Sequence, residues 1–126
     1  MKKLPATFGS MTEDKESNQG AVEIRPLSVN MCWQGRRFKT PEYKAYERET
    51  LLLLPKRKMI KGNVEVYLIF FFKNDKMRDI DNSIKPILDF FTKKGYIEDD
   101  RKIIHLDISK QKSEREGFAF EIMEVR

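Results

Sequence analysis

The sequence has little cysteine or histidine and no long apolar segment. Its 126 residues include one cysteine, Cys32, and one histidine, His105. One cysteine cannot form an internal disulfide framework or a zinc site built from several thiolates. The longest apolar run, residues 66–72, is much shorter than the roughly 20 residues that a transmembrane helix needs. Because residues 1–20 also lack the apolar core of a secretory signal, we expect no membrane association and a reducing, cytoplasmic location.

Charged residues are abundant, and the positive ones are concentrated in one segment. Hydrophobic residues make up 40% of the chain and charged residues 36%, which is typical of one globular domain at this length. The formal net charge is +5. Residues 33–61 hold nine Lys or Arg and three Glu, a local charge of 9 − 3 = +6. A basic face attracts polyanions such as nucleic acid, although a solvated lysine-rich surface explains the same composition equally well.

The N-terminal part of the chain divides into an arm and a strand. Residues 1–20 are polar with few large apolar groups, so we expect a flexible arm, followed by a single domain over residues 21–126. Residues 21–30 alternate apolar and polar positions, which predicts a short strand. Pro26 in this segment favours an edge strand or a bend, because proline cannot donate to a strand ladder.

A helix and a buried strand follow. Thr40 and Pro41 have the residue types of an N-cap and a first helical position, and Pro55 predicts the end of this helix. The basic residues 56–61 are expected to form a loop. Residues 64–72 are apolar on both alternating faces for much of their length, which predicts a central strand covered on both sides.

A second helix is predicted after a short polar loop. Apolar residues repeat from Ile84 at i, i+3, i+4 and i+7, and Gly95 marks the end. Asn82 or Ser83 can cap the start. Since proline is tolerated mainly in the first helical turn, Pro86 places the start of this helix near Ser83.

Two further strands complete the predicted fold. Residues 102–109 and 117–125 have strand patterns and are joined by the charged turn 111–116, so we expect them to close the structure as a pair. The predicted fold class is α+β, a small mixed β-sheet with two main helices packed against it.

Clustered carboxylates precede the second helix. Asp79 and Asp81 project to the same side if the backbone between them is extended. Hard divalent cations such as Mg²⁺ prefer carboxylate oxygens and keep open positions for water and phosphate. Asp100 follows Asp81 by nineteen positions (100 − 81) and can return to this site. Lys85 lies four residues after Asp81, one helical turn away, where its ammonium can stabilise charge that builds up in phosphoryl transfer.

Less specific interpretations fit the same residues. The aspartates can be a polar turn whose charges favour a helix N-terminus, and Asn82 is more typical of a cap than of a ligand. Asp89 is expected at the surface or in a supporting position, and His105, between apolar neighbours, in a structural role. Since Glu98 and Asp99 adjoin Asp100, the third ligand stays ambiguous among these three acids.

The chain contains, in this order, the pattern D-x-D-N-x-x-K, a predicted helix that ends at a glycine, and an Asp-Asp pair. This order of motifs resembles that of the RusA family of Holliday junction resolvases. This similarity runs over residues 78–110, with a weaker one in VNMCWQGRRFKTPEYKAY. It implies a small α+β homodimer that binds a four-way DNA junction on a basic surface and nicks two strands symmetrically with Mg²⁺. It also implies catalytic carboxylates at Asp79, Asp81 and Asp100 and a catalytic lysine at Lys85.

Three hypotheses about function follow. The leading one is a Mg²⁺-dependent, structure-selective endonuclease of recombination and repair, with phosphate contacts from Arg36, Arg37, Lys39 and Lys44. The second is a non-catalytic nucleic-acid-binding module in which the aspartates are turn and cap residues. The third is a nuclease of the same chemistry that acts on other branched DNA. Trp33 can stack on an unpaired base or pack at the edge of the core.

Overall fold

The computed structural model describes residues 17–27, 33–34, 38–73 and 80–125, with the backbone alone for residues 33–34, 38–39 and 80–82. Its elements, in chain order, are β1 (Ser17–Val22), β2 (Trp33–Gln34), β3 (Phe38–Lys39), α1 (Pro41–Leu53), β4 (Val64–Phe72), α2 (Ile80–Lys94), the 3₁₀ turn η4 (Asp100–Lys102), β5 (Ile103–Lys112) and β6 (Gly117–Glu124). Among the helices described, none is long and apolar enough to cross a membrane.

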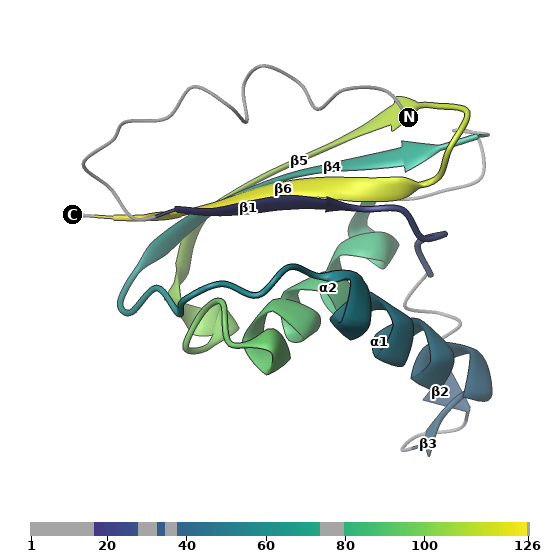
Figure 1. The fold of residues 1–126 in the computed structure, drawn as a ribbon, viewed down its shortest axis with the longest axis horizontal. Coiled ribbons are helices and arrows are strands. Elements are labelled where there is room, and N and C mark those ends of the chain that lie inside the picture. The colour runs from purple at the N-terminus through teal and green to yellow at the C-terminus, as the bar shows by residue number, and fades with distance from the viewer. Residues whose placement is uncertain (1–16, 28–32, 35–37, 74–79, 126) are drawn as a thin grey trace.

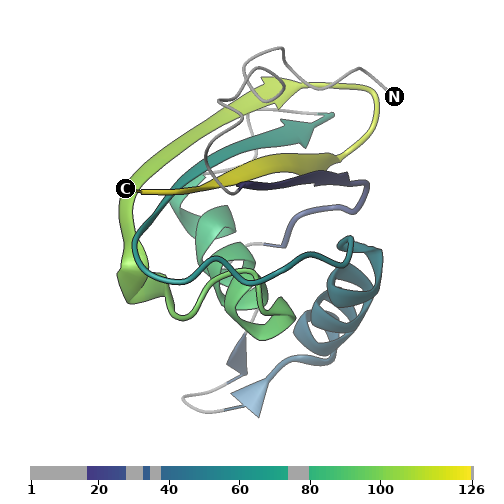
Figure 2. The ribbon, with the colours of Figure 1, turned by 60° about the vertical axis from the view of Figure 1, so that its left-hand side comes forward.

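Four strands form one mixed sheet in the order β1-β6-β4-β5. β4 runs parallel to β5 and antiparallel to β6, and β1 runs antiparallel to β6. Both α1 and α2 lie on the same face of this sheet, while β2 and β3 form a small separate ribbon (Figures 1 and 2). The predicted α+β fold class, a mixed sheet with two helices against it, is confirmed.

The two C-terminal strands were predicted correctly as elements but wrongly as a pair. β5 and β6 do not bond to each other, because β4 lies between them and pairs with both. The connection from β4 through α2 to β5 is a crossover, which is what a parallel strand pair requires. As the most apolar segment of the chain, β4 gains burial from a strand on each side.

The inner face of the sheet carries most of the core. Alternate residues of β4, from Val64 to Phe72, are fully buried against the helices, together with Phe118, Phe120 and Ile122 of β6. Tyr67 and Ile69, on the opposite face of β4, are only half-buried. The predicted cover of β4 on both sides is therefore only partial, because both helices pack on the same face.

Helix α1 has the predicted boundaries. The side chain of Thr40 accepts a hydrogen bond from the backbone N–H of Tyr43 (3.1 Å), and Pro41 is the first helical residue. The helix ends at Leu53, with Leu54 as C-cap. The capping residues Thr40 and Pro41 were sufficient to predict where this element begins.

Helix α2 begins earlier than predicted. It starts at Ile80, so Pro86 lies inside the helix and neither Asn82 nor Ser83 is a cap. Pro86 lacks the N–H that would bond to the carbonyl four residues earlier. It is nevertheless buried, and the apolar residues around it face the sheet. Gly95, with φ 84°, ends the helix as predicted, because glycine adopts this conformation without strain.

The first strand also differs from the prediction. β1 covers Ser17–Val22 rather than residues 21–30, so residues 17–20, which we had assigned to the arm, belong to the sheet. Its polar residues give no apolar alternation, and their place in the sheet comes from pairing with β6, from Ser17 opposite Met123 to Val22 opposite Phe118. Residues 1–16 of the predicted arm lie outside the described residues.

Candidate active site

The predicted site residues lie on α2 and η4. Asp79 lies outside the described residues. Asp81 is in the first turn of α2, in helical rather than extended backbone, and only its backbone is described. Lys85 is exposed one turn later, and Asp100 is the exposed first residue of η4.

Ionisable residues recur every fourth position along α2. Asp81, Lys85, Asp89 and Lys93 fall on one side of the helix, since residues four apart are neighbours on a helix surface. Consecutive members are about 6 Å apart along the axis. The predicted spacing of Lys85 one turn after Asp81 is therefore present. Lys85 stands between two acidic positions, one on each side.

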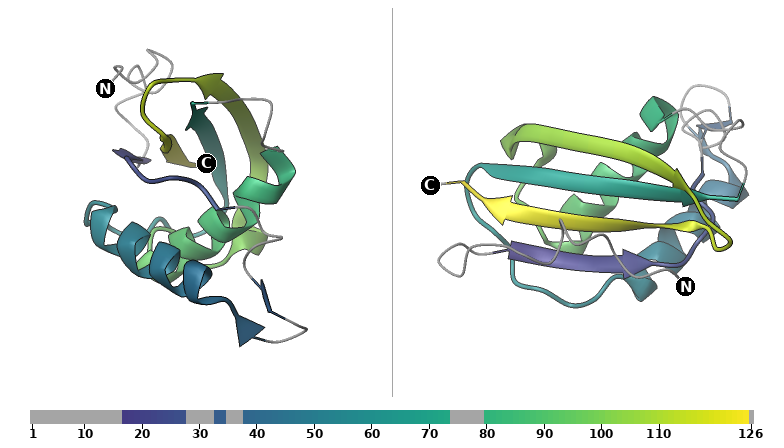
Figure 3. Two further views of the ribbon diagram at one scale, coloured as in Figure 1. Left: turned by 90° about the vertical axis from the view of Figure 1, so that its right-hand side faces the viewer. Right: turned by 90° about the horizontal axis from the view of Figure 1, so that it is seen from above.

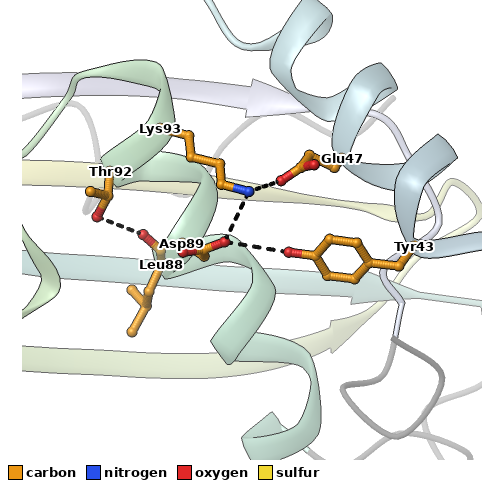
Figure 4. A network of polar contacts seen from close by, with 6 residues as sticks. All are labelled: Tyr43, Glu47, Leu88, Asp89, Thr92 and Lys93. Carbon is orange, nitrogen blue, oxygen red and sulfur yellow. Dashed lines mark hydrogen bonds and ion pairs between the residues drawn. The ribbon is translucent and has the colours of Figure 1, made fainter. Parts of the chain in front are cut away.

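Asp89 joins the two helices. The Tyr43 hydroxyl of α1 donates a hydrogen bond to Asp89 (3.4 Å), and the Lys93 ammonium lies 3.5 Å from the same carboxylate oxygen. Lys93 also bonds to Glu47 of α1 (Figure 4). These contacts connect α1 to the same side of α2 that carries Lys85. The surface position expected for Asp89 is confirmed, since its side chain is about half exposed. Its partner Tyr43 on α1 was not predicted.

The turn η4 presents two adjacent carboxylates. Asp99 is its N-cap and accepts hydrogen bonds from the backbone N–H of Arg101 (2.9 Å) and from its side chain (3.3 Å). The backbone bond from Arg101, together with a hydrogen bond to Asp100, lowers the pKa of Asp99. A lowered pKa keeps Asp99 ionised in its capping role.

Asp100 has the opposite electrostatic environment. Its hydrogen bond with Asp99 raises the pKa of Asp100. Slight desolvation of the carboxyl group and the charges of Asp99 and Asp89 raise this pKa further, while Lys85 lowers it. Asp100 is therefore within electrostatic range of Asp89 and Lys85 on α2, which contacts η4. Acidic groups that repel one another in this way favour a nearby cation.

The third acid of this cluster has another structural role. A carboxylate oxygen of Glu98 accepts a hydrogen bond from the backbone N–H of Gly62 (2.7 Å), which ties the turn after α2 to the loop before β4. Glu98 thus binds this loop and Asp99 caps η4. Asp100 is the acid of the three whose pKa is affected by Asp89 and Lys85 of α2.

The donor chemistry of this region suits a hard divalent cation. Carboxylate oxygens are the protein ligands that Mg²⁺ prefers, and the residues offered are aspartates on α2 and η4. Among the residues described, no three acidic, histidine or cysteine side chains lie together as a metal site. The candidate ligand set includes Asp79 and the side chain of Asp81, which are not described.

The candidate DNA-contacting residues are described only in part. Arg36 and Arg37 lie outside the described residues, and Lys39 lies in β3, where its backbone pairs opposite Trp33 of β2. Lys44 is exposed on α1. Exposed lysines and an arginine continue the basic segment in the loop after α1: Lys56, Arg57, Lys58 and Lys61.

His105 lies on β5 and is exposed rather than enclosed by the core. Its ring contacts Tyr67 of β4, with centroids 5.6 Å apart. On the same face, the Tyr67 hydroxyl donates a hydrogen bond to Glu65 (2.6 Å). His105 therefore lies away from the carboxylates of α2 and η4, on the face of the sheet opposite the helices.

A mixed four-stranded sheet with two helices on one face, and with acidic residues and a lysine on α2 and η4, defines a small α+β domain. A family model described as endodeoxyribonuclease RusA matches residues 22–123. The chain therefore belongs to the RusA family. No curated protein matches the chain.

Proposed function

We propose that this protein is a Mg²⁺-dependent endodeoxyribonuclease that resolves Holliday junctions by paired symmetric nicks, in recombination and repair in the cytoplasm. The observation that carries the proposal is the position of Lys85. It follows Asp81 by one helical turn and lies within electrostatic range of Asp100, in a chain of the RusA endodeoxyribonuclease family.

Each residue has a role in this proposal. Asp79, Asp81 and Asp100 would hold the Mg²⁺ ion, which supplies a Lewis acid for the scissile phosphate when it is bound. Lys85 places a fixed positive charge beside the phosphate, where negative charge grows in the transition state. Asp99 keeps Asp100 in place by capping η4.

The substrate is a four-way DNA junction, and the protein acts as a homodimer. Two copies of one site serve two opposed strands, which suits a symmetric oligomer. Phosphate contacts come from Lys44 on α1 together with Arg36, Arg37 and Lys39, which would make junction binding strongly dependent on salt.

Cleavage of a synthetic four-way junction tests the proposal. The full chain should produce symmetric paired nicks with Mg²⁺ and none with EDTA. Asp81→Asn should bind the junction with unchanged affinity but cut it at least about a hundredfold more slowly, because several kcal/mol of charge stabilisation are lost. Glu114→Gln, an exposed substitution in the turn between β5 and β6, is the matched control. A folded wild-type chain that makes no nick with Mg²⁺ contradicts the proposal.

The same assay separates the two other functions. A non-catalytic binding module would bind junctions with Asp81→Asn and wild type alike and cut with neither. A nuclease for other branched DNA would cut flaps or three-way junctions faster than four-way junctions in a panel of equal concentration.

A further inference from the structure

Arg101 lies directly after Asp100, one of the acids that would bind Mg²⁺ in the proposed function. It is the second residue of η4, and its side chain is 86% exposed. Its guanidinium donates one hydrogen bond, from Nε to Oδ1 of Asp99 (3.3 Å). The two Nη groups therefore have no hydrogen-bond partner among the residues that the structure describes.

One carboxylate holds both the backbone and the side chain of Arg101. Oδ1 of Asp99 accepts a hydrogen bond from the backbone N–H of Arg101 (2.9 Å) in addition to the bond from Nε. The carboxyl groups of Asp99 and Asp100 also share a hydrogen bond. Because Asp99 contacts both neighbours, the guanidinium of Arg101 lies beside the carboxyl group of Asp100.

The free part of this guanidinium suits a phosphate. With Nε bonded to Asp99, the Nη1 and Nη2 groups keep their N–H donors in a planar fork. Such a fork binds two oxygens of one phosphate through charge-assisted hydrogen bonds, which fix orientation as well as add energy. An ion pair as exposed as that of Arg101 and Asp99 adds little to the stability of a fold, so stability alone does not account for the arrangement.

Arg115 provides a contrast on the same protein. It lies in the turn between β5 and β6 and pairs with Glu23 over the same distance (3.3 Å), but it does so through Nη1. β5 runs along one margin of the sheet and separates this turn from η4 (Figure 3). Since ten residues of strand span roughly 33 Å, Arg115 is an exposed, paired arginine far from Asp100.

From this geometry we propose that Arg101 binds the phosphate next to the scissile phosphate on the cleaved strand, with Asp99 as its positioning residue. The inference rests on the proposed function, because that function brings DNA to Asp100. Lys85 and the Mg²⁺ ligands act on the scissile phosphate. Arg101, one residue beyond Asp100, contacts its neighbour and thereby fixes which bond of the strand lies at the metal.

Neutralisation of single phosphates tests this contact. Synthetic four-way junctions carry one methylphosphonate at each phosphate around the cut, and single-turnover cleavage is measured at limiting protein concentration. Wild type should slow about tenfold at one position adjacent to the cut, since a hydrogen bond to a charged group is lost. Arg101→Ala should be about tenfold slower on unmodified DNA, and the same methylphosphonate should slow it no further. Arg115→Ala, the matched control, should respond as wild type does at every position.

The salt dependence of junction binding gives a readout that a purely structural role would not move. Removal of one phosphate contact reduces the slope of log affinity against log salt by about 1. Arg101→Ala should show this reduction in EDTA, where no strand is cut. Arg101→Lys keeps the charge and should keep the wild-type slope, as should Arg115→Ala. Far-ultraviolet circular dichroism of each variant confirms that it is folded.

The role of Asp99 is tested by combining substitutions. If Asp99 positions the guanidinium, then adding Arg101→Ala to Asp99→Asn should slow cleavage by clearly less than tenfold, because coupled residues are not additive. Full additivity overturns the role of Asp99.

Two results would overturn the contact itself. One is an equal response of wild type and Arg101→Ala to a methylphosphonate at every position, and the other is an unchanged salt slope in Arg101→Ala. A wild-type chain that cuts no junction contradicts the nuclease proposal instead, and the salt slopes measured in EDTA still decide whether Arg101 contacts a phosphate.

Discussion

The hydroxyl of Tyr43 on α1 donates a hydrogen bond to Asp89 on α2. Tyr43 is buried, and its ring packs against that of Phe90, which also lies on α2, with ring centroids 5.8 Å apart. The polar and apolar contacts of one side chain therefore fix α1 against the helix that carries Lys85. The basic residues of α1 are thereby held at a constant position relative to the charged side of α2.

Substitution of Tyr43 should separate these two contacts. Tyr43→Phe keeps the ring and removes the hydroxyl, so we expect a loss of about 1 kcal/mol in the free energy of unfolding. Tyr43→Ala also removes the buried ring and should cost about 3 kcal/mol or more. Urea unfolding of both variants measures these losses. Glu49→Gln, at an exposed position of α1, is the control. Equal stability of Tyr43→Phe, Tyr43→Ala and Glu49→Gln would contradict the contacts of Tyr43 with α2.

The three neighbouring acids before β5 should differ in their effect on cleavage. Asp100→Asn should reduce the rate at saturating junction at least about a hundredfold, as expected for a metal ligand. Glu98→Gln removes the carboxylate that accepts the bond from Gly62 and should change the rate little. Asp99→Asn should have an intermediate effect with an increased Mg²⁺ requirement, because η4 loses an ionised cap. Single-turnover kinetics over a Mg²⁺ titration measure all three, and a larger loss with Glu98→Gln than with Asp100→Asn would reverse the assignment.

The sequence predicted those features of the structure that depend on residues close together in the chain, and it did not predict those that depend on distant residues. The start of α1 was predictable because Thr40 and Pro41 act on their own turn. The start of α2 was not, because the helix runs from Ile80 through Pro86, although Pro86 cannot make one of its hydrogen bonds, and buries Ile84 and Ile87 on either side of it. The boundaries of β1 were also not predictable. Its polar residues form a strand because they pair with β6, about a hundred positions away in the chain.

The same distinction holds for the candidate site. The spacing of Lys85 after Asp81 is local and was predicted. The structural role of Glu98 was not predictable, because it depends on Gly62, a residue before β4 that only the folded chain brings to this acid. The bond from Tyr43 to Asp89 likewise joins residues far apart in sequence, and no local pattern indicates it.

Gly117 should tolerate no side chain. A Cβ at this position would lie 2.2 Å from the carbonyl oxygen of Val22, which is backbone and cannot turn aside. Gly117→Ala should therefore separate β1 from β6 where β6 begins and destabilise the protein by about 1 to 3 kcal/mol. Thermal unfolding measures the change, with Glu114→Ala in the preceding turn as the control. An unchanged midpoint for Gly117→Ala would show that β1 does not approach β6 so closely.

Glu121 should make the stability of the protein depend on pH. Its side chain is fully buried on β6, and neither carboxylate oxygen has a hydrogen-bond partner among the residues described. Burial raises the pKa of Glu121 from 4.5 to about 7. The folded state therefore retains this proton at pH values where the unfolded chain has lost it. The contribution of Glu121 to stability then falls as pH rises from about 4.5 to about 7, and it stays low above that range.

Glu121→Gln removes this titration. A buried amide carries a cost of its own at every pH, so the informative quantity is the difference between two pH values. From about pH 5 to about pH 8, wild type should lose up to about 3 kcal/mol relative to the variant. Urea unfolding at both pH values measures this difference, and Glu114→Gln should follow the wild-type profile. Parallel profiles for wild type and Glu121→Gln would mean that Glu121 is solvated or paired in solution.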